Sequence, residues 1–285
     1  MPDLTRYRAI LFDVDGVLRR GEQPVPGAAE AVRRVRALGK RVGVVTNNSA
    51  YSARGIHAAL AALGFDFEPG EIFAAPRATA AWMMARPGGR RAFVLGTDGL
   101  KEELTEQGIE CIDAPETVDY RCDYLVVAGC LHINYELLTQ ALRVGLTGAC
   151  FVAVNRDRMF PGSSGMHPGA GAIVGAVSGM LGRDPDIVIG KPSPHLAHYA
   201  LAQLGVAAAE CLLIGDTLDS DVAFGKAAGM DTALVLTGIA RADEITPETA
   251  PTFVLPSVAA IGADPPAPEA AVDEGDSALR GAAPR

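Results

Sequence analysis

Residues 9–16 read Ala-Ile-Leu-Phe-Asp-Val-Asp-Gly, a short apolar run that ends in two carboxylates and a glycine. A continuous apolar run of this length predicts a strand buried on both faces, as in a parallel sheet. Residues 41–46, Arg-Val-Gly-Val-Val-Thr, repeat the plan, and an Ala-rich segment of helical pattern lies between the two runs. The chain is therefore expected to open with a βαβ unit.

Three later apolar runs predict further parallel strands, at residues 187–190, 211–215 and 232–236. Two helix-length segments separate them, at 194–204 and 220–228. Ser193 and Asp219 stand where helix N-caps are expected. Gly205 and Gly229 follow the two segments, at the C-terminal position that glycine favours.

The middle of the chain has its own alternation of strands and helices, predicted at 91–95, 98–107, 123–129, 134–146 and 150–154. A segment of this size can support a separate core. We therefore expect a discontinuous first domain, residues 1–75 plus 187–262, with residues 76–186 inserted into it. Residues 263–285 are rich in Pro, Ala and Gly without apolar periodicity, which predicts a disordered tail.

The composition narrows the class of protein. The 285 residues include 49% hydrophobic and 21% charged residues, an ordinary globular balance, and the formal net charge of −9 argues against a nucleic-acid partner. The longest nearly apolar stretch, residues 169–182, is shorter than the roughly 20 residues of a membrane-spanning helix. The start of the chain lacks an apolar signal core, and the five cysteines form no Cys-x-x-Cys pair. These features predict a cytoplasmic protein without a membrane partner.

Four polar clusters follow predicted strands: Asp13-Val14-Asp15-Gly16, Thr46-Asn47-Asn48-Ser49, Gly190-Lys191-Pro192-Ser193, and Gly215-Asp216 with Asp221. Taken singly, each cluster also fits a turn, a helix cap or a solvated lysine. In a doubly wound sheet, however, the carboxyl ends of the strands meet at one crevice where ligands bind. Their joint position indicates an active site there.

Three of these carboxylates, Asp13, Asp15 and Asp216, are predicted to crowd together at that edge. Like charges in a partly dehydrated cleft repel unless a cation compensates, so the cluster implies a bound divalent metal. None of the four clusters contains Cys or His, and hydroxyl and amide groups suited to phosphate oxygens lie nearby. This donor set favours Mg²⁺ over Zn²⁺.

With these four motifs in this order, the sequence resembles the haloacid dehalogenase (HAD) superfamily of aspartyl phosphohydrolases. The resemblance runs from about Ala9 to Ala240. It points to the subfamily of nitrophenylphosphatase-like, phosphoglycolate, pyridoxal-phosphate and nucleotide phosphatases. That subfamily carries a large α/β cap between its second and third motifs, here between Thr46 and Lys191. The implied fold is α/β, a doubly wound, Rossmann-like parallel-sheet core with an inserted cap.

The resemblance also implies roles for the first and last motifs. Asp13 would attack phosphorus and form an aspartyl phosphate, while Asp15 would act as general acid and then as general base. Mg²⁺ would bind the carboxylates of Asp13 and Asp216 and the backbone carbonyl of Asp15. Asp221 would lie behind these ligands and orient them or the motif lysine.

The remaining motifs are expected to bind the phosphoryl group. Thr46, the backbone N–H of Asn47, and Asn48 would contact its oxygens, and Lys191 would neutralise charge in the transition state. Asn155, Asp157 and His167 are candidates for the specificity surface of the cap.

The substrate is expected to be a small phosphorylated metabolite, with sugar, polyol, nucleotide and pyridoxal phosphates and phosphoglycolate as candidates. Two other functions remain open on the same scaffold: phosphotransfer to a second substrate and non-catalytic sensing of a phosphorylated metabolite. Dehalogenation is disfavoured because expelling halide needs no acid such as Asp15. A homodimer formed through the cap is one open arrangement.

Overall fold

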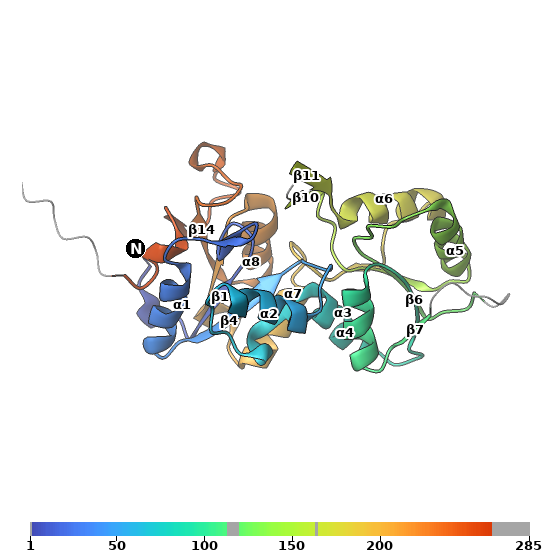
Figure 1. Cartoon of the computed structure of the whole chain (residues 1–285), viewed down its shortest axis with the longest axis horizontal. Coiled ribbons are helices and arrows are strands. Elements are labelled where there is room, and N and C mark those ends of the chain that lie inside the picture. Colours follow the sequence, from blue (N-terminus) through green and yellow to red (C-terminus); the bar gives the residue numbers. More distant parts are fainter. Residues whose placement is uncertain (1, 113–119, 163–164, 264–285) are drawn as a thin grey trace, which may run out of the picture.

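A computed structural model describes residues 2–112, 120–162 and 165–263. The predicted disordered tail lies outside these residues, apart from Ala263. Figure 1 shows two sheets in two lobes along the long axis of the molecule, with the first and last parts of the chain in one lobe and the middle part in the other. Across the described ranges, no helix combines the length and apolar character needed to cross a bilayer.

The first lobe holds a six-stranded sheet with every pairing parallel, in the order β15-β14-β13-β1-β4-β5. Its strands are β1 (Ala9–Phe12), β4 (Arg41–Thr46), β5 (Ile72–Ala74), β13 (Cys211–Gly215), β14 (Asp231–Val235) and β15 (Phe253–Leu255). The chain runs outward from β1 in one direction and later from β13 in the other. The strand order therefore reverses beside β1, where a doubly wound sheet forms its binding crevice.

Helices cover both faces of this sheet because the side chains of each buried strand alternate between the faces. Ile10 and Phe12 of β1 pack into the apolar cluster that includes helices α1 (Ala28–Ala37) and α2 (Ala53–Ala62). Ala9 and Leu11 pack into the opposite cluster. That cluster contains residues of α3 (Ala75–Met84), α7 (His195–Leu204) and α8 (Ala223–Ala228).

The second lobe holds a five-stranded parallel sheet in the order β12-β9-β8-β6-β7. Its strands are β6 (Arg91–Leu95), β7 (Glu110–Ile112), β8 (Tyr124–Val127), β9 (Cys150–Ala153) and β12 (Ile187–Val188). Helices α5 (Tyr135–Leu146) and α6 (Ala170–Leu181) pack on one face, and α4 (Asp98–Glu106) packs on the other.

Short elements connect these layers. Two antiparallel hairpins are formed by β2 (Arg19–Arg20) with β3 (Gln23–Pro24) and by β10 (Met159–Gly162) with β11 (Gly165–Pro168). Single 3₁₀ turns lie at Leu4–Arg6, Pro69–Glu71, Ala208–Glu210, Ala242–Glu244 and Val258–Ala260. A π-helical turn, η4 (Leu218–Val222), leads into α8.

One apolar cluster joins the two sheets. Leu11 of β1 and Phe73 of β5 belong to the same cluster as Val94 of β6 and Val126 of β8. A second cluster, which includes Phe93 and Val174, belongs to the five-stranded sheet and its outer helices alone. The middle segment therefore has one apolar cluster of its own and shares another with the first sheet.

The structure corrects the assignment of residues 187–190 to the first sheet. Only Ile187–Val188 form a strand, and this strand pairs with β9 at the edge of the five-stranded sheet. The carboxylate of Asp186 accepts a hydrogen bond from the Phe151 N–H at 2.7 Å, which fixes the register just before the pairing. The next strand of the first sheet is therefore β13, which begins at Cys211.

Two predicted helix caps also differ. Thr217, rather than Asp219, caps η4, because the threonine has extended backbone and its hydroxyl accepts from the first turn. Ser193 is not the N-cap of α7, which begins after Pro194 without a side-chain cap. Gly205 and Gly229 end their helices in the left-handed conformation, as predicted.

A buried carboxylate fastens the two lobes together. Glu103 of α4 is only 1% exposed, and it accepts hydrogen bonds from the Ala53 N–H at 2.6 Å and from Arg77 at 3.0 Å. Close by, Thr97 donates to the backbone carbonyl of Ser49 at 2.6 Å. A side chain at Gly99 would collide with the backbone of residues 51 and 52. Helix α4 is therefore seated directly on the segment that follows β4.

Replacing Glu103 by alanine is expected to lower the free energy of unfolding by about 3 kcal/mol, because a buried ion pair and a hydrogen bond to Ala53 lose their acceptor. Urea denaturation measures the loss. Glu106→Ala is the matched control on the same helix, since Glu106 pairs with Arg54 in an exposed ion pair worth less than about 1 kcal/mol. Equal losses in the two variants would contradict the assignment.

Candidate active site

Two carboxylates project from the carboxyl ends of neighbouring strands. Asp13 follows β1 and Asp216 follows β13, and the two strands are paired in register from Ala9 with Cys211 to Phe12 with Ile214. The backbone N–H of Asp13 still donates to the Ile214 carbonyl at 2.9 Å, so the ladder continues up to the site. Both side chains are buried. The rigid sheet therefore places them side by side at the strand-order reversal.

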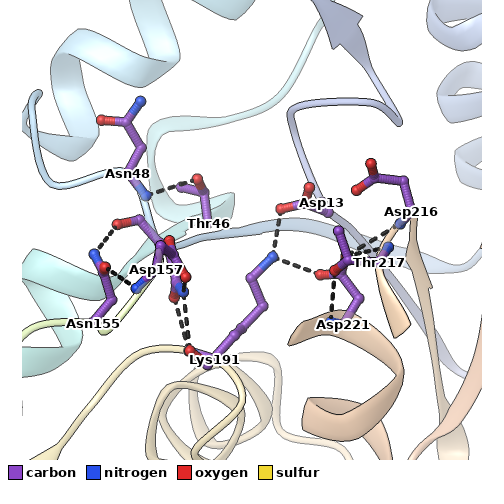
Figure 2. Close-up of polar contacts among 10 residues, drawn as sticks. Asp13, Thr46, Asn48, Asn155, Asp157, Lys191, Asp216, Thr217 and Asp221 are labelled. Carbon is purple, nitrogen blue, oxygen red and sulfur yellow. Dashed lines mark hydrogen bonds and ion pairs between the residues drawn. The ribbon is translucent and has the colours of Figure 1, made fainter. Parts of the chain in front are cut away.

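A buried ammonium group connects this pair to a third carboxylate. The Nζ of Lys191 lies 2.6 Å from Asp13 Oδ1 and 2.6 Å from Asp221 Oδ1. Figure 2 shows Lys191 reaching between the two aspartates. Burial opposes the charge, but the two carboxylates hold the pKa of Lys191 above its ordinary value, so it stays an ammonium.

Asp221 is fully engaged by its surroundings. Its Oδ2 accepts from the Thr217 hydroxyl at 2.6 Å and from the backbone N–H groups of Asp216 and Thr217 at 3.1 Å, while Oδ1 accepts from Lys191. Burial opposes ionisation, yet Lys191 and these hydrogen bonds keep the pKa of Asp221 below its ordinary value. Asp221 therefore orients Lys191 and the backbone of Asp216, and its oxygens are occupied.

The carboxylate of Asp216 lies in a cradle that two glycines make possible. A Cβ atom at Gly16 or at Gly238 would overlap Asp216 Oδ2, because both backbones pass directly against the carboxylate. Gly16 also has a φ of 85°, which side-chain-bearing residues rarely adopt. The Ile239 N–H donates to the same oxygen at 2.8 Å. Gly238 was not predicted as a site residue, since its role depends on a contact between distant parts of the chain.

Burial raises the pKa of Asp13 and of Asp216. It raises the pKa of Asp13 well above the ordinary value, with Asp221 and Asp216 adding to the effect and Lys191 opposing it. It raises the pKa of Asp216 to about 7, with Asp221 again contributing. When Asp13, Asp216 and Asp221 are all ionised, the single ammonium of Lys191 neutralises one of their three negative charges and leaves two uncompensated.

Asp15 lies at the more open side of the site. Its Oδ1 accepts from Arg19 Nε at 3.0 Å, and its side chain is 44% exposed. The loop from Asp15 to Arg19 closes on itself, since the Gly16 N–H donates to the Arg19 carbonyl at 2.7 Å. A carboxyl group that is held in place and reachable by solvent suits proton exchange with a departing oxygen and with water.

The residues after β4 divide into two groups. Thr46 is buried, and its hydroxyl accepts from the Asn48 N–H at 3.1 Å. The Asn47 side chain is committed elsewhere, because its Oδ1 accepts from the Lys191 N–H at 2.8 Å and its Nδ2 donates to the Lys191 carbonyl at 3.0 Å. The backbone N–H of Asn47 is therefore the group left for the phosphate contact, which stays a prediction.

The side chain of Asn48 does not join the cluster around Lys191. Its Oδ1 accepts from the Ala50 N–H at 2.9 Å, closing a turn. Figure 2 shows the amide pointing away from Asp13 and Lys191. Asparagine often closes such turns with its own side chain. A phosphate contact from Asn48 stays a prediction.

Two of the candidate specificity residues support the site from behind. Asn155 Nδ2 donates to the Asn47 carbonyl at 2.8 Å, and Asp157 Oδ1 accepts from Asn47 Nδ2 at 2.9 Å. They therefore position the loop after β4 rather than line a specificity surface. The third candidate, His167 on β11, stacks on Phe160 of β10 with ring centroids 5.4 Å apart. Asp219 is exposed.

Among the described residues, Asp13, Asp216 and Asp221 each place a carboxylate oxygen within 4.8 Å of the others and could hold a metal ion. Because the oxygens of Asp221 already accept four hydrogen bonds, the two ligands available are Asp13 and Asp216. Oxygen donors and uncompensated negative charge are what a hard divalent cation requires. The arrangement can therefore hold such a cation beside a nucleophilic carboxylate.

Comparison with known proteins supports this reading of the site. Residues 10–110 match the family described as haloacid dehalogenase-like hydrolase, and residues 188–261 match a second described as HAD-hydrolase-like. The sugar-phosphatase AraL of Bacillus subtilis (strain 168) is 33% identical over 249 residues, which cover 87% of this chain and 90% of AraL.

Solved structures agree over both lobes. The p-nitrophenyl phosphatase from Archaeoglobus fulgidus superposes with a TM-score of 0.83 at 37% identity, covering 90% of this chain and 98% of that one. A glycerol phosphate phosphatase from Mycobacterium tuberculosis, solved in complex with calcium, gives a TM-score of 0.81 at 30% identity and covers 90% of this chain and 75% of that one. The residue ranges of the two family matches span all four motifs described above.

The raised pKa of Asp216 predicts a pH-dependent stability when divalent cations are chelated. The folded chain binds a proton at Asp216 up to a pH of about 7, whereas the unfolded chain releases it near the ordinary pKa of 3.8. Stability is therefore lost as the pH rises from about 4 to about 7, by up to about 1.4 kcal/mol per pH unit.

Asp216→Asn removes this titration, so in chelator its free energy of unfolding is expected to fall less than that of the native protein over the same window. Denaturant titrations at several pH values measure the difference. Parallel stability curves for the two proteins would show that Asp216 has an ordinary pKa.

Proposed function

This chain belongs to the haloacid dehalogenase-like hydrolases and hydrolyses phosphoric monoesters of small molecules, and on that premise we propose that it acts through a phosphorylated Asp13. The observation that carries the proposal is the ion pair between Lys191 and Asp13, 2.6 Å long and buried at the strand-order reversal of the sheet. It holds a carboxylate oxygen in a fixed direction at the floor of the crevice. A positioned carboxylate is a competent nucleophile toward phosphorus.

Two displacements at phosphorus complete the reaction. Asp13 attacks in line with the ester bond, which breaks with its electron pair as Asp15 donates a proton to the departing alcohol oxygen. Asp15 then takes a proton from water, whose oxygen attacks the phosphorus of the aspartyl phosphate and releases Asp13 and inorganic phosphate. The partial exposure of Asp15 admits that water, and its contact with Arg19 fixes the direction of the carboxyl group.

The phosphoryl oxygens are bound by groups on the neighbouring loops. The Thr46 hydroxyl and the backbone N–H of Asn47 follow β4, and the Lys191 ammonium stands opposite Asp221. Removing one such donor typically lowers the rate by about 2.7–4 kcal/mol of transition-state stabilisation. The clamp between Asn47 and the Lys191 backbone keeps the hydroxyl, the N–H and the ammonium in one arrangement.

We propose Mg²⁺ as the resident cation, held by the carboxylates of Asp13 and Asp216 and by the backbone carbonyl of Asp15. The oxygen donor set and the two uncompensated negative charges fit a hard divalent ion. When bound, the ion supplies positive charge that lowers the repulsion between Asp13 and the phosphoryl oxygens. It also favours the ionised forms of Asp13 and Asp216, whose pKa values burial otherwise raises.

For the physiological substrate, we propose a small phosphomonoester found in the cytoplasm. The relatives support this class, since they include a sugar phosphatase and a glycerol phosphate phosphatase. The phosphatase activities of these relatives also favour hydrolysis over phosphotransfer and over sensing without catalysis. Release of inorganic phosphate in the absence of any acceptor alcohol distinguishes hydrolysis from phosphotransfer.

Asp13→Asn is expected to abolish phosphate release from 4-nitrophenyl phosphate, because an amide cannot form the acyl phosphate. A loss of at least about four orders of magnitude would correspond to removal of the nucleophile. The measurement is nitrophenol absorbance, with thermal unfolding of the variant as a check on its fold. Activity within tenfold of the native protein would rule out Asp13 as the nucleophile.

Removal of divalent cations is expected to stop turnover, since the carboxylates of Asp13 and Asp216 then repel the phosphate and each other. Activity is assayed after dialysis against a chelator and again after adding Mg²⁺ or Ca²⁺ alone. We expect Mg²⁺ to restore the rate and Ca²⁺ to bind with little activity, because Ca²⁺ takes more ligands in looser geometry. Full activity in chelator would refute the metal requirement.

A further inference from the structure

A cavity of about 300 Å³ opens beside the proposed catalytic groups and has no role in the mechanism so far. It lies between helix α2 and the segment that follows Asp13. Val14 lines one side, and Ile56 and Leu60 of α2 line the other, all three of them buried side chains. Its polar lining includes Thr46 and Arg19. This size falls at the lower end of small-molecule binding sites.

Three residues of the cavity lining adjoin the proposed catalytic groups. Val14 stands in the chain between the nucleophile Asp13 and the acid Asp15. Arg19 in the lining donates from its Nε to Asp15 Oδ1 at 3.0 Å, and Thr46 in the lining is a proposed phosphoryl ligand. An ester whose phosphate sits against Asp13 and whose oxygen faces Asp15 therefore has the cavity directly beside its alcohol.

The wall of the cavity favours carbon over hydroxyl groups. The side chains that α2 and Val14 contribute to the lining are aliphatic, and Tyr51, an exposed aromatic residue, adds a ring that can pack on a planar ligand. The charged and amide side chains of the lining, Arg19, Glu22 and Asn48, come from the β2–β3 hairpin and from the loop after β4 rather than from α2. A sugar or polyol would have to leave several hydroxyls against an apolar wall, which costs free energy.

We propose that the cavity between α2 and residues 14–22 receives the organic part of the substrate. The aliphatic lining then selects phosphomonoesters of aryl or hydrocarbon alcohols over phosphomonoesters of polyhydroxylated alcohols. The inference rests on the proposed function and adds a substrate class to it. It places the specificity of this chain partly in the six-stranded lobe. Burial of a ring against the aliphatic wall supplies the preference.

The test uses two non-hydrolysable phosphonates, so that binding is measured apart from catalysis. Benzylphosphonate carries a ring that reaches the cavity, whereas methylphosphonate carries only the phosphonate and a methyl group. Calorimetric titration of the native protein with Mg²⁺ present is expected to give at least about tenfold tighter binding of benzylphosphonate.

Ala59→Phe fills the cavity from its rim. Ala59 is an exposed residue of α2 that lines the cavity, so the larger side chain can be accommodated without repacking the core. We expect benzylphosphonate to bind about tenfold more weakly to this variant, with a much smaller change for methylphosphonate. Ala59→Leu is expected to shift affinity in the same direction by less. Ala58→Phe is the matched control, since Ala58 is exposed on the same helix but does not line the cavity.

The outcomes distinguish the cavity assignment from the proposed function. Equal affinity of the native protein for the two phosphonates, or equal weakening by Ala58→Phe and Ala59→Phe, would overturn the cavity assignment and leave the proposed function standing. Failure of the native protein to bind either phosphonate would overturn both. As a kinetic check, Ala59→Phe is expected to lower kcat/KM for 4-nitrophenyl phosphate more than for glycerol phosphate.

Discussion

The arrangement of the site depends on one buried ammonium group. A charge removed from water must be paired, and Lys191 satisfies this requirement with Asp13 on one side and Asp221 on the other. Its backbone is clamped by the Asn47 side chain, and Asp221 in turn holds the backbone of Asp216. The Lys191 ammonium thus connects the loops after β1, β4 and β13. Its hydrogen bond to Asp13 fixes the orientation of the nucleophilic carboxylate.

Much of the fold follows from apolar runs that end in polar residues. The strands before Asp13 and Asp216 were predictable because buried parallel strands leave continuous hydrophobic runs. Strands β5 and β15 have three residues each, too few for a recognisable period, and neither was predicted. The run at 187–190 marked a strand, but a local pattern cannot tell which of two parallel sheets will pair with it.

The site, like the fold, has features that the sequence pattern predicts and features that it does not. That Asp13, Lys191 and Asp216 meet follows from the rule that parallel strands end at one edge. The supporting contacts do not follow from any rule of spacing. Gly238 is needed because its backbone passes against a carboxylate that lies 22 residues earlier in the chain. The side chain of Asn48 turned to its own loop, since a turn hydrogen bond was available within two residues.

The apolar cluster shared by the two sheets has a consequence for how the molecule comes apart. Leu11 and Val94 belong to different lobes but to one continuous packing arrangement, so separating the lobes would expose aliphatic surface on both. Loss of either lobe's structure thereby removes packing from the other. The two lobes should consequently melt as one cooperative unit, and the middle segment expressed alone would present an unsatisfied hydrophobic face prone to association.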